Sequence, residues 1–390
     1  MALPLNELDG MLLDRPHLDA YAEALRRTVT PASVVYDLKA GTGLLSLIAC
    51  RLGARRVFAV ERTAAAEIVI EAAKDNGYAG RIVVLHAPPT QTTSHEHVDV
   101  VVSPVHKMPL SYPTDIVDLA AAWHRVASPD THLLPEACTL WFAVVSAPEA
   151  FARTQAARNG PPYGLDLRST SRYMENSPQP IRSGSECLLG EPVQWSRLEF
   201  RSMSAFRPRG GGTFTVVAGG TAHGLLAWLD TEITDEIGVS NSPGSGGAAA
   251  SQVFFPWPES VALEPGDQVE VGLRGDLVAG QMVWTWTTEI RAQRGDTSGF
   301  RHARQSSFLS APVSRETLRK RSVTFVPNLS TSGQLVLEVL GKVRPGATVG
   351  DLAGELQAAH PAVFNSRDEA HGFVAAVCER YASPNGRGDS

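Results

Sequence analysis

Residues 34–48, VVYDLKAGTGLLSLI, join two short apolar runs through an acid and a glycine-rich turn. Asp37 ends the first run, and Gly41 and Gly43 allow the tight turn and the close approach of backbone to a ligand. The next apolar run ends at Glu61, eighteen residues after Gly43, where an acid accepts hydrogen bonds from ribose hydroxyls. This spacing predicts a loop that binds a dinucleotide or S-adenosylmethionine. A structural turn in an unrelated α/β domain is the alternative.

The surrounding pattern predicts the fold that positions this loop. From residue 34 to about 142, the strand-like runs SVVYDL, RVFAVE, RIVVLH and HVDVVVS alternate with helical runs, which indicates a parallel sheet covered by helices. After residue 138, short strands separated by turn residues predict an antiparallel barrel or sandwich. After residue 311, a short strand, SVTFV, precedes three amphipathic helices, and Ser366 and Glu369 form a capping-box pattern.

These changes of pattern predict five parts of the chain. They are an N-terminal helical segment (1–30), a Rossmann-like domain (31–137), a β-barrel domain with an arm near 150–185 (138–310), a small winged-helix-like domain (311–383) and a disordered tail (384–390).

Composition narrows the class of protein. The net charge of −6 argues against a general nucleic-acid binder, which would usually be basic. The four cysteines are far apart and form no CxxC pair, so we expect reduced thiols and no metal site. The first residues lack the pattern of a signal peptide, and no run is long and apolar enough to span a membrane. We therefore expect a cytoplasmic protein.

In their order along the chain, these segments resemble the protein arginine methyltransferases and their bacterial relatives over residues 10–310. The resemblance rests on MLLDRPHLDAYAEAL, the loop and acid described above, HVDVVVSP, THLLPEACTLW, PPYGLDL and the barrel strands HGLLAWLDTEI and QMVWTWTTEI. It implies S-adenosylmethionine as the cofactor, a Rossmann-like domain followed by a barrel, and a homodimer formed through the arm near 150–185.

The departures from the family's pattern bear on activity. The family's first-helix arginine falls on His17, its first loop glycine on Lys39, and its two substrate-gripping glutamates on Pro104 and Pro113. The acid expected to meet adenine falls near Pro89, and the Thr-His-Trp loop falls in SPGSGGAAASQ. Guanidinium needs paired carboxylates to orient it and offset its charge, so ordinary arginine methylation is not expected.

Lys39 and His17 leave the cofactor pocket open to three interpretations. The Lys39 side chain could crowd the cofactor, its ammonium could replace the missing arginine at the cofactor carboxylate with help from His17, or it could point to solvent beside a dead pocket.

Other residues near the end of the fourth strand are candidates for chemistry. His106 could act as a general base near neutral pH, although a surface histidine is the simpler interpretation. Tyr112 is a second catalytic candidate, and Ser103 and Lys107 are predicted to face the substrate. Methyl transfer needs mainly alignment and a deprotonated nucleophile, so one base can suffice.

The C-terminal part resembles, more weakly, the PqqD-like domains that bind a leader peptide; a packing module is the alternative. Two hypotheses follow. The chain is an S-adenosylmethionine-dependent methyltransferase with a non-standard acceptor in a peptide or protein, or it is an inactive homologue that serves as a dimeric scaffold.

Overall fold

The computed structural model describes residues 12, 14–93, 96–105, 114–158, 162–203, 206–245, 252–278, 281–293 and 299–382. The chain divides into two compact units, residues 1–312 and 313–390, each of which is described by itself. None of the helices in the described ranges is long and apolar enough to cross a membrane.

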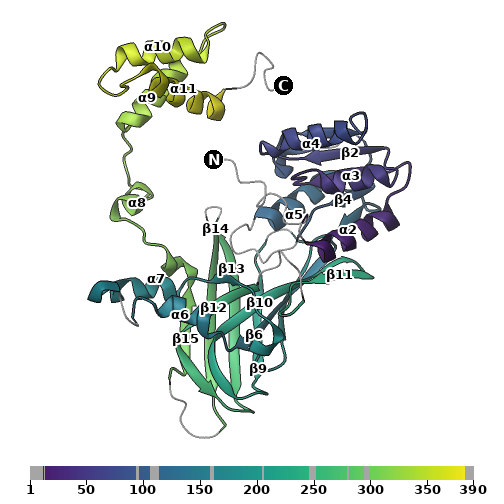
Figure 1. Ribbon diagram of the computed structural model, residues 1–390, viewed down its shortest axis with the longest axis vertical. Helices are drawn as coiled ribbons and strands as arrows, with labels where there is room; N and C mark the ends of the chain where they lie inside the picture. Colours follow the sequence, from purple (N-terminus) through teal and green to yellow (C-terminus); the bar gives the residue numbers. More distant parts are fainter. Residues whose placement is uncertain are drawn as a thin grey trace. The chain divides into compact units, whose positions relative to one another are not determined.

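A five-stranded parallel sheet with the order β3-β2-β1-β4-β5 forms the first part of the larger unit (Figure 1). Apolar β-branched runs build these strands, which are buried because helices cover the sheet. The strands are β1 (Val34–Leu38), β2 (Arg56–Val60), β3 (Ile82–Leu85), β4 (Val100–Val102) and β5 (His132–Leu134). The helices are α2 (Arg15–Thr28), α3 (Leu44–Arg51), α4 (Ala65–Asp75), η2 (Pro89–Gln91) and α5 (Thr114–Val126).

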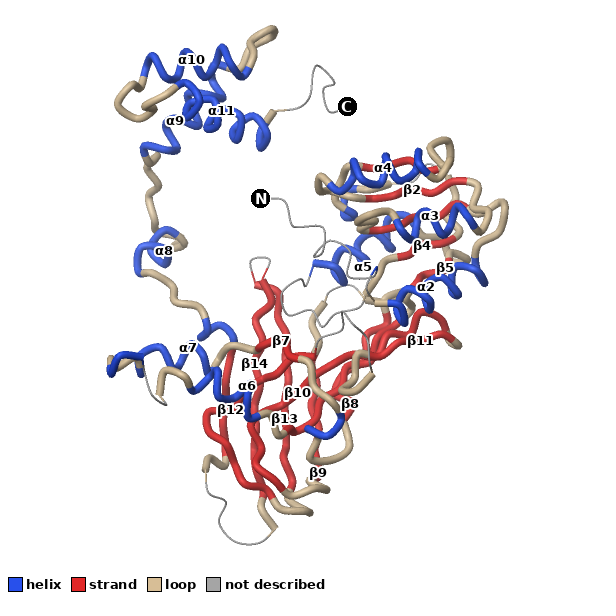
Figure 2. Tube along the Cα trace, viewed as in Figure 1, coloured by secondary structure: helices blue, strands red, loops and turns tan. Residues whose placement is uncertain are grey.

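Long antiparallel strands follow in two sheets, drawn in red in Figure 2. The first has the order β7-β12-β10-β6-β8 with β11 beside β10, and the second has the order β15-β14-β13-β9. Their bounds are β6 (Ala137–Val145), β7 (Gln179–Ile181), β8 (Val193–Glu199), β9 (Arg209–Thr215), β10 (Gly220–Thr234), β11 (Ile237–Ser240), β12 (Gln252–Leu263), β13 (Gln268–Val278), β14 (Gln281–Arg291) and β15 (His302–Ser306).

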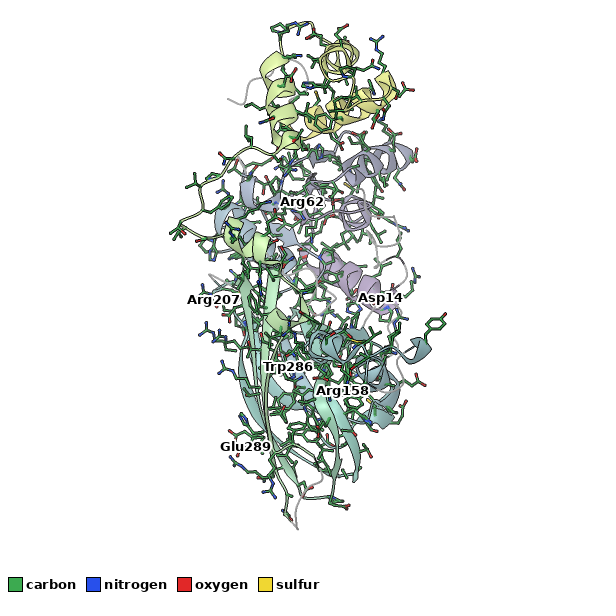
Figure 3. All side chains as sticks on the ribbon, turned by 90° about the vertical axis from the view of Figure 1, so that its left-hand side faces the viewer. Asp14, Arg62, Arg158, Arg207, Trp286 and Glu289 are labelled. Carbon is green, nitrogen blue, oxygen red and sulfur yellow. The ribbon has the colours of Figure 1, made fainter. Side chains whose placement is uncertain are left out.

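The two antiparallel sheets meet where β8 lies beside β9. A Cβ at Gly210 would come 1.7 Å from the carbonyl oxygen of Trp195, so only glycine allows this approach. Alternation along β14 places Trp286 in the interior, while the side chain of Glu289 faces outward (Figure 3). The predicted combination of a Rossmann-like sheet with an antiparallel part is confirmed.

The stretch near 150–185, predicted as an arm, carries short helices. They are α6 (Pro148–Gln155), η3 (Pro162–Gly164), η4 (Arg168–Thr170) and α7 (Ser171–Glu175), with η5 (Ser185–Cys187) after β7. Within it, Tyr163 is 98% exposed, and Leu165 and Leu167 are also exposed. The arm thus carries three exposed apolar side chains.

The second unit contains the three predicted helices, α9 (Thr331–Lys342), α10 (Val349–Ala359) and α11 (Arg367–Tyr381), around a core of their own. η6 (Ser307–Ser310) precedes it, and α8 (Arg315–Lys320) lies at its start. The predicted strand SVTFV is wrong: residues 322–325 form a turn in which Phe325 N–H donates to the Ser322 carbonyl. A strand needs a pairing partner, and the described part of this unit contains no strand.

The helix caps differ in detail from the prediction. Ser366 accepts from the Glu369 N–H, but the Glu369 carboxylate accepts from Asn365 rather than from Ser366. The complete capping box lies at α10, between Thr348 and Asp351. The predicted disordered tail at 384–390 lies outside the described residues.

Candidate functional site

The loop after β1 has a left-handed backbone at three positions. Lys39, Gly41 and Gly43 have φ angles of 63°, 56° and 80°. A non-glycine residue in this region costs roughly 1–2 kcal/mol, so the loop imposes strain at Lys39. Gly43 is also the N-cap of α3, and a Cβ there would lie 3.0 Å from Cγ1 of Val69. The loop geometry therefore requires glycine at 43 for both backbone and steric reasons.

Two buried carboxylates flank this loop. Asp37, in β1, accepts a 2.6 Å hydrogen bond from Ser46 Oγ in the first turn of α3, which ties the strand to the helix. Glu61, just after β2, accepts from the Gly41 N–H at 3.0 Å through Oε2. Its Oε1 accepts from the N–H and the hydroxyl of Thr63 at 2.8 and 2.7 Å.

Glu61 thus holds the loop and keeps some capacity to accept. A carboxylate has about four lone-pair positions. Three of those of Glu61 accept the hydrogen bonds just described. One position on Oε2 therefore fits a hydroxyl donor such as a ribose. Together with the glycine loop and the uncapped start of α3, these residues fit a nucleoside-bearing cofactor.

Helix α2 contributes two buried side chains to the same end of the sheet. His17 Nδ1 lies 3.0 Å from Oδ1 of Asp14, which is labelled in Figure 3 at the start of α2. One turn later, Tyr21 donates to the Ser103 carbonyl at 3.2 Å and accepts from the Val105 N–H at 3.0 Å. Burial raises the pKa of Tyr21 far above its usual value, so its hydroxyl stays protonated and able to donate.

Ser103 follows β4 at the edge where β1 also ends, because Asp37 pairs with Val102 in the sheet. This edge is the point where the strand order reverses, the place where open α/β sheets bind ligands. The structure thus brings Asp37, Lys39 and Ser103 to neighbouring strand ends. His106, Lys107 and Tyr112 lie outside the described residues. Within the described ranges, no cluster of three or more His, Cys, Asp or Glu could hold a metal ion.

Four residues of this region were not among the predicted site residues. Ser46, Thr63, Tyr21 and Thr231 all form the hydrogen bonds that hold the two strand ends. Spacing offers a signal for Ser46 and Thr63, which are close in sequence to the acids they contact. Tyr21 stood only within the segment MLLDRPHLDAYAEAL, without a role of its own, and Thr231 lies too far along the chain for any local pattern to indicate it.

Comparison with known proteins agrees with this geometry. The family model of the ribosomal protein L11 methyltransferase (PrmA) matches residues 20–117. The chain is 27% identical over 248 residues to the probable protein arginine N-methyltransferase 6 of Arabidopsis thaliana, covering 60% of this chain and 55% of that protein. It thus spans just over half the length of this relative. It is 26% identical over 270 residues to the arginine N(omega)-methyltransferase of Streptomyces achromogenes subsp. streptozoticus, covering 68% and 74%.

A solved structure with the same architecture is the Trypanosoma brucei PRMT1 enzyme–prozyme heterotetrameric complex with AdoHcy. It superposes with a TM-score of 0.65 at 18% identity, covering 76% of this chain and 95% of the other. Fold and site therefore define a protein of the S-adenosylmethionine-dependent methyltransferase fold. More particularly, the chain is similar in sequence and fold to the protein arginine methyltransferases, as the sequence resemblance predicted.

Proposed function

We propose that the chain binds S-adenosylmethionine and transfers its methyl group to a peptide or protein. The observation that carries this proposal is the left-handed loop whose Gly41 N–H is bonded to the buried Glu61 carboxylate. A purely structural turn does not require a buried acid that keeps one free acceptor position. A ribose hydroxyl, in contrast, would donate to that position. When bound, the cofactor supplies an electrophilic methyl group on a sulfonium. Asp37, Gly41, Gly43 and Glu61 would hold its nucleoside part.

Lys39 and His17 are our candidates for the cofactor carboxylate. Lys39 lies in the loop itself, and His17 is buried one turn before Tyr21 on the helix that reaches Ser103. Lys39 keeps a left-handed backbone that glycine would adopt without strain. We propose that the ammonium offsets this cost by pairing with the carboxylate.

The acceptor is proposed to be a nucleophile other than arginine. Pro104, where the family has a glutamate, supplies no carboxylate to orient a guanidinium. Ser103 and Lys107 would face the acceptor, with His106 as general base and Tyr112 as a second proton-transfer candidate. Deprotonating an amine or hydroxyl and aligning it with the methyl group requires no carboxylate pair.

A second candidate function is a silent homologue that acts as a scaffold, and the same Pro104 favours it. The exposed apolar residues Tyr163, Leu165 and Leu167 support the proposal that the arm mediates a homodimer, because exposed apolar side chains mark interaction sites. The exposed Leu337 and Tyr381 support a peptide-binding role for the C-terminal unit. The four free thiols fit the cytoplasmic location that we propose.

Calorimetric titration with S-adenosylmethionine and S-adenosylhomocysteine tests the enzyme against the scaffold. We expect micromolar binding of both, weakened at least tenfold in Glu61→Gln. The exposed Glu67→Gln on α4 is the matched control and should bind as the wild type does. Transfer of labelled methyl groups to lysine- or serine-containing peptides, rather than to arginine-containing ones, would support the acceptor proposal. If millimolar ligand produced no heat of binding and no thermal shift, the proposed enzymatic function would be refuted, and the scaffold function would be the one supported.

A further inference from the structure

The backbone segment from Ser103 to Val105, where β4 ends, is held by side chains from two distant parts of the chain. Tyr21 on α2 donates to the Ser103 carbonyl and accepts from the Val105 N–H. Thr231 on β10 of the antiparallel part donates to the Val105 carbonyl at 3.2 Å. All four residues are at most 3% exposed, so water does not compete for these hydrogen bonds.

Pro104 explains why these partners converge on Val105. Proline has no N–H, so Val105 carries the first backbone donor after Ser103. Ser103 N–H itself donates to Leu134 in β5 at 2.9 Å and is therefore committed to the sheet. The two polar backbone atoms of Val105 are thus divided between Tyr21, which accepts from the N–H, and Thr231, which donates to the carbonyl.

We propose that Tyr21 and Thr231 are positioning residues for the acceptor side of the active site. This proposal rests on the proposed methyltransferase function, in which Ser103, held by Tyr21, faces the acceptor. α2 also carries His17, our candidate for the cofactor carboxylate, whereas β10 belongs to the antiparallel part. Val105 is therefore a backbone position that is held both from α2, which carries His17, and from the antiparallel part.

The first test measures hydrogen–deuterium exchange of the Val105 amide in the full chain. Tyr21→Phe removes one hydroxyl and should accelerate this exchange at least tenfold, because the N–H loses its acceptor. Tyr36→Phe, which loses a hydroxyl bond to the Thr93 carbonyl elsewhere in the same sheet, should leave it within twofold of the wild type. Equal exchange in the two variants, or a uniform acceleration across residues 14–158, would overturn the proposal.

The second test separates positioning from general stability. Thr231→Val keeps the side-chain shape and removes the bond to Val105, while Thr154→Val removes a hydroxyl bond to the Phe151 carbonyl within α6 of the arm. In Thr231→Val, we expect kcat with the accepted peptide to fall about tenfold while KM for S-adenosylmethionine is unchanged. In Thr154→Val, we expect kcat and KM to stay as in the wild type. Unchanged kcat in Thr231→Val would overturn its role.

The two proposals fail in different ways. If the wild type did not bind the cofactor, the proposed methyltransferase function would be refuted, and with it the role of these residues in positioning an acceptor. Normal cofactor binding with unaltered Val105 exchange in Tyr21→Phe would sink the positioning role alone.

Discussion

Two neighbouring strand ends at the same edge of the parallel sheet are held in opposite ways. The loop after β1 is fixed by residues close in sequence, since Ser46 and Glu61 lie 9 and 20 positions from their partners. The segment after β4 is fixed by Tyr21 and Thr231, which lie 82 and 126 positions from theirs. The loop after β1 can thus be encoded as a local motif, whereas the segment after β4 depends on how α2 and the antiparallel part pack against it.

The largest expected effect tests the local loop. Gly43→Ala should lower the free energy of unfolding by about 3 kcal/mol, combining left-handed strain with the 3.0 Å contact to Val69. Gly77, at φ 73°, has no atom within 4 Å of its would-be Cβ, so Gly77→Ala should cost only about 1 kcal/mol. Urea denaturation checks both variants. Equal losses would mean that the Val69 contact relaxes and that only the backbone sets the need for glycine.

Lys39 tests the loop after β1 in two ways, because its backbone is strained and its ammonium is proposed to contact the cofactor. Lys39→Gly should be about 1 kcal/mol more stable than Lys39→Ala, since glycine adopts φ 63° without a Cβ penalty. If the ammonium pairs with the cofactor carboxylate, both variants should bind S-adenosylmethionine more weakly in calorimetry. Binding by Lys39→Gly as tight as that of the wild type, or tighter, would refute the pairing.

A second long-range hydrogen bond, between His223 and Ala147 beside the arm, allows a test by the pH dependence of stability. His223 Nδ1 accepts from the Ala147 N–H at 3.2 Å, and its ring lies 5.1 Å from that of Phe151. Burial lowers the pKa of His223, so the fold favours the neutral ring. The resulting stability is present above the usual pKa near 6.5 and is lost as the pH falls through the folded value.

Between pH 7.5 and 5, the wild type should lose on the order of 1 kcal/mol more stability than His223→Asn, which keeps an acceptor and does not titrate. The exposed His302→Asn should retain the wild-type slope. Parallel stability profiles for the wild type and His223→Asn would show that the arm does not depend on a neutral histidine.

Much of the fold was predictable because period and turn chemistry are local properties. Alternating strand and helix runs indicated the parallel sheet, and the later short strands indicated the antiparallel part. SVTFV failed because β-branched residues favour a strand only where another strand can pair with them. In the described C-terminal unit, Val323 is fully exposed and has no such neighbour.

The sequence by itself determined the geometry of the candidate cofactor loop: Asp37, the glycines at 41 and 43, and Glu61 stand at spacings that a strand, a turn and a helix bring together. Only the tertiary structure decided that Lys39 is left-handed, and that Tyr21 and Thr231 meet at Val105. The physical reason is separation along the chain. The hydrogen bond between Tyr21 and Ser103 exists only after α2 has packed on the parallel sheet, and the bond between Thr231 and Val105 only after the parallel and antiparallel parts have packed. No local pattern carries that information.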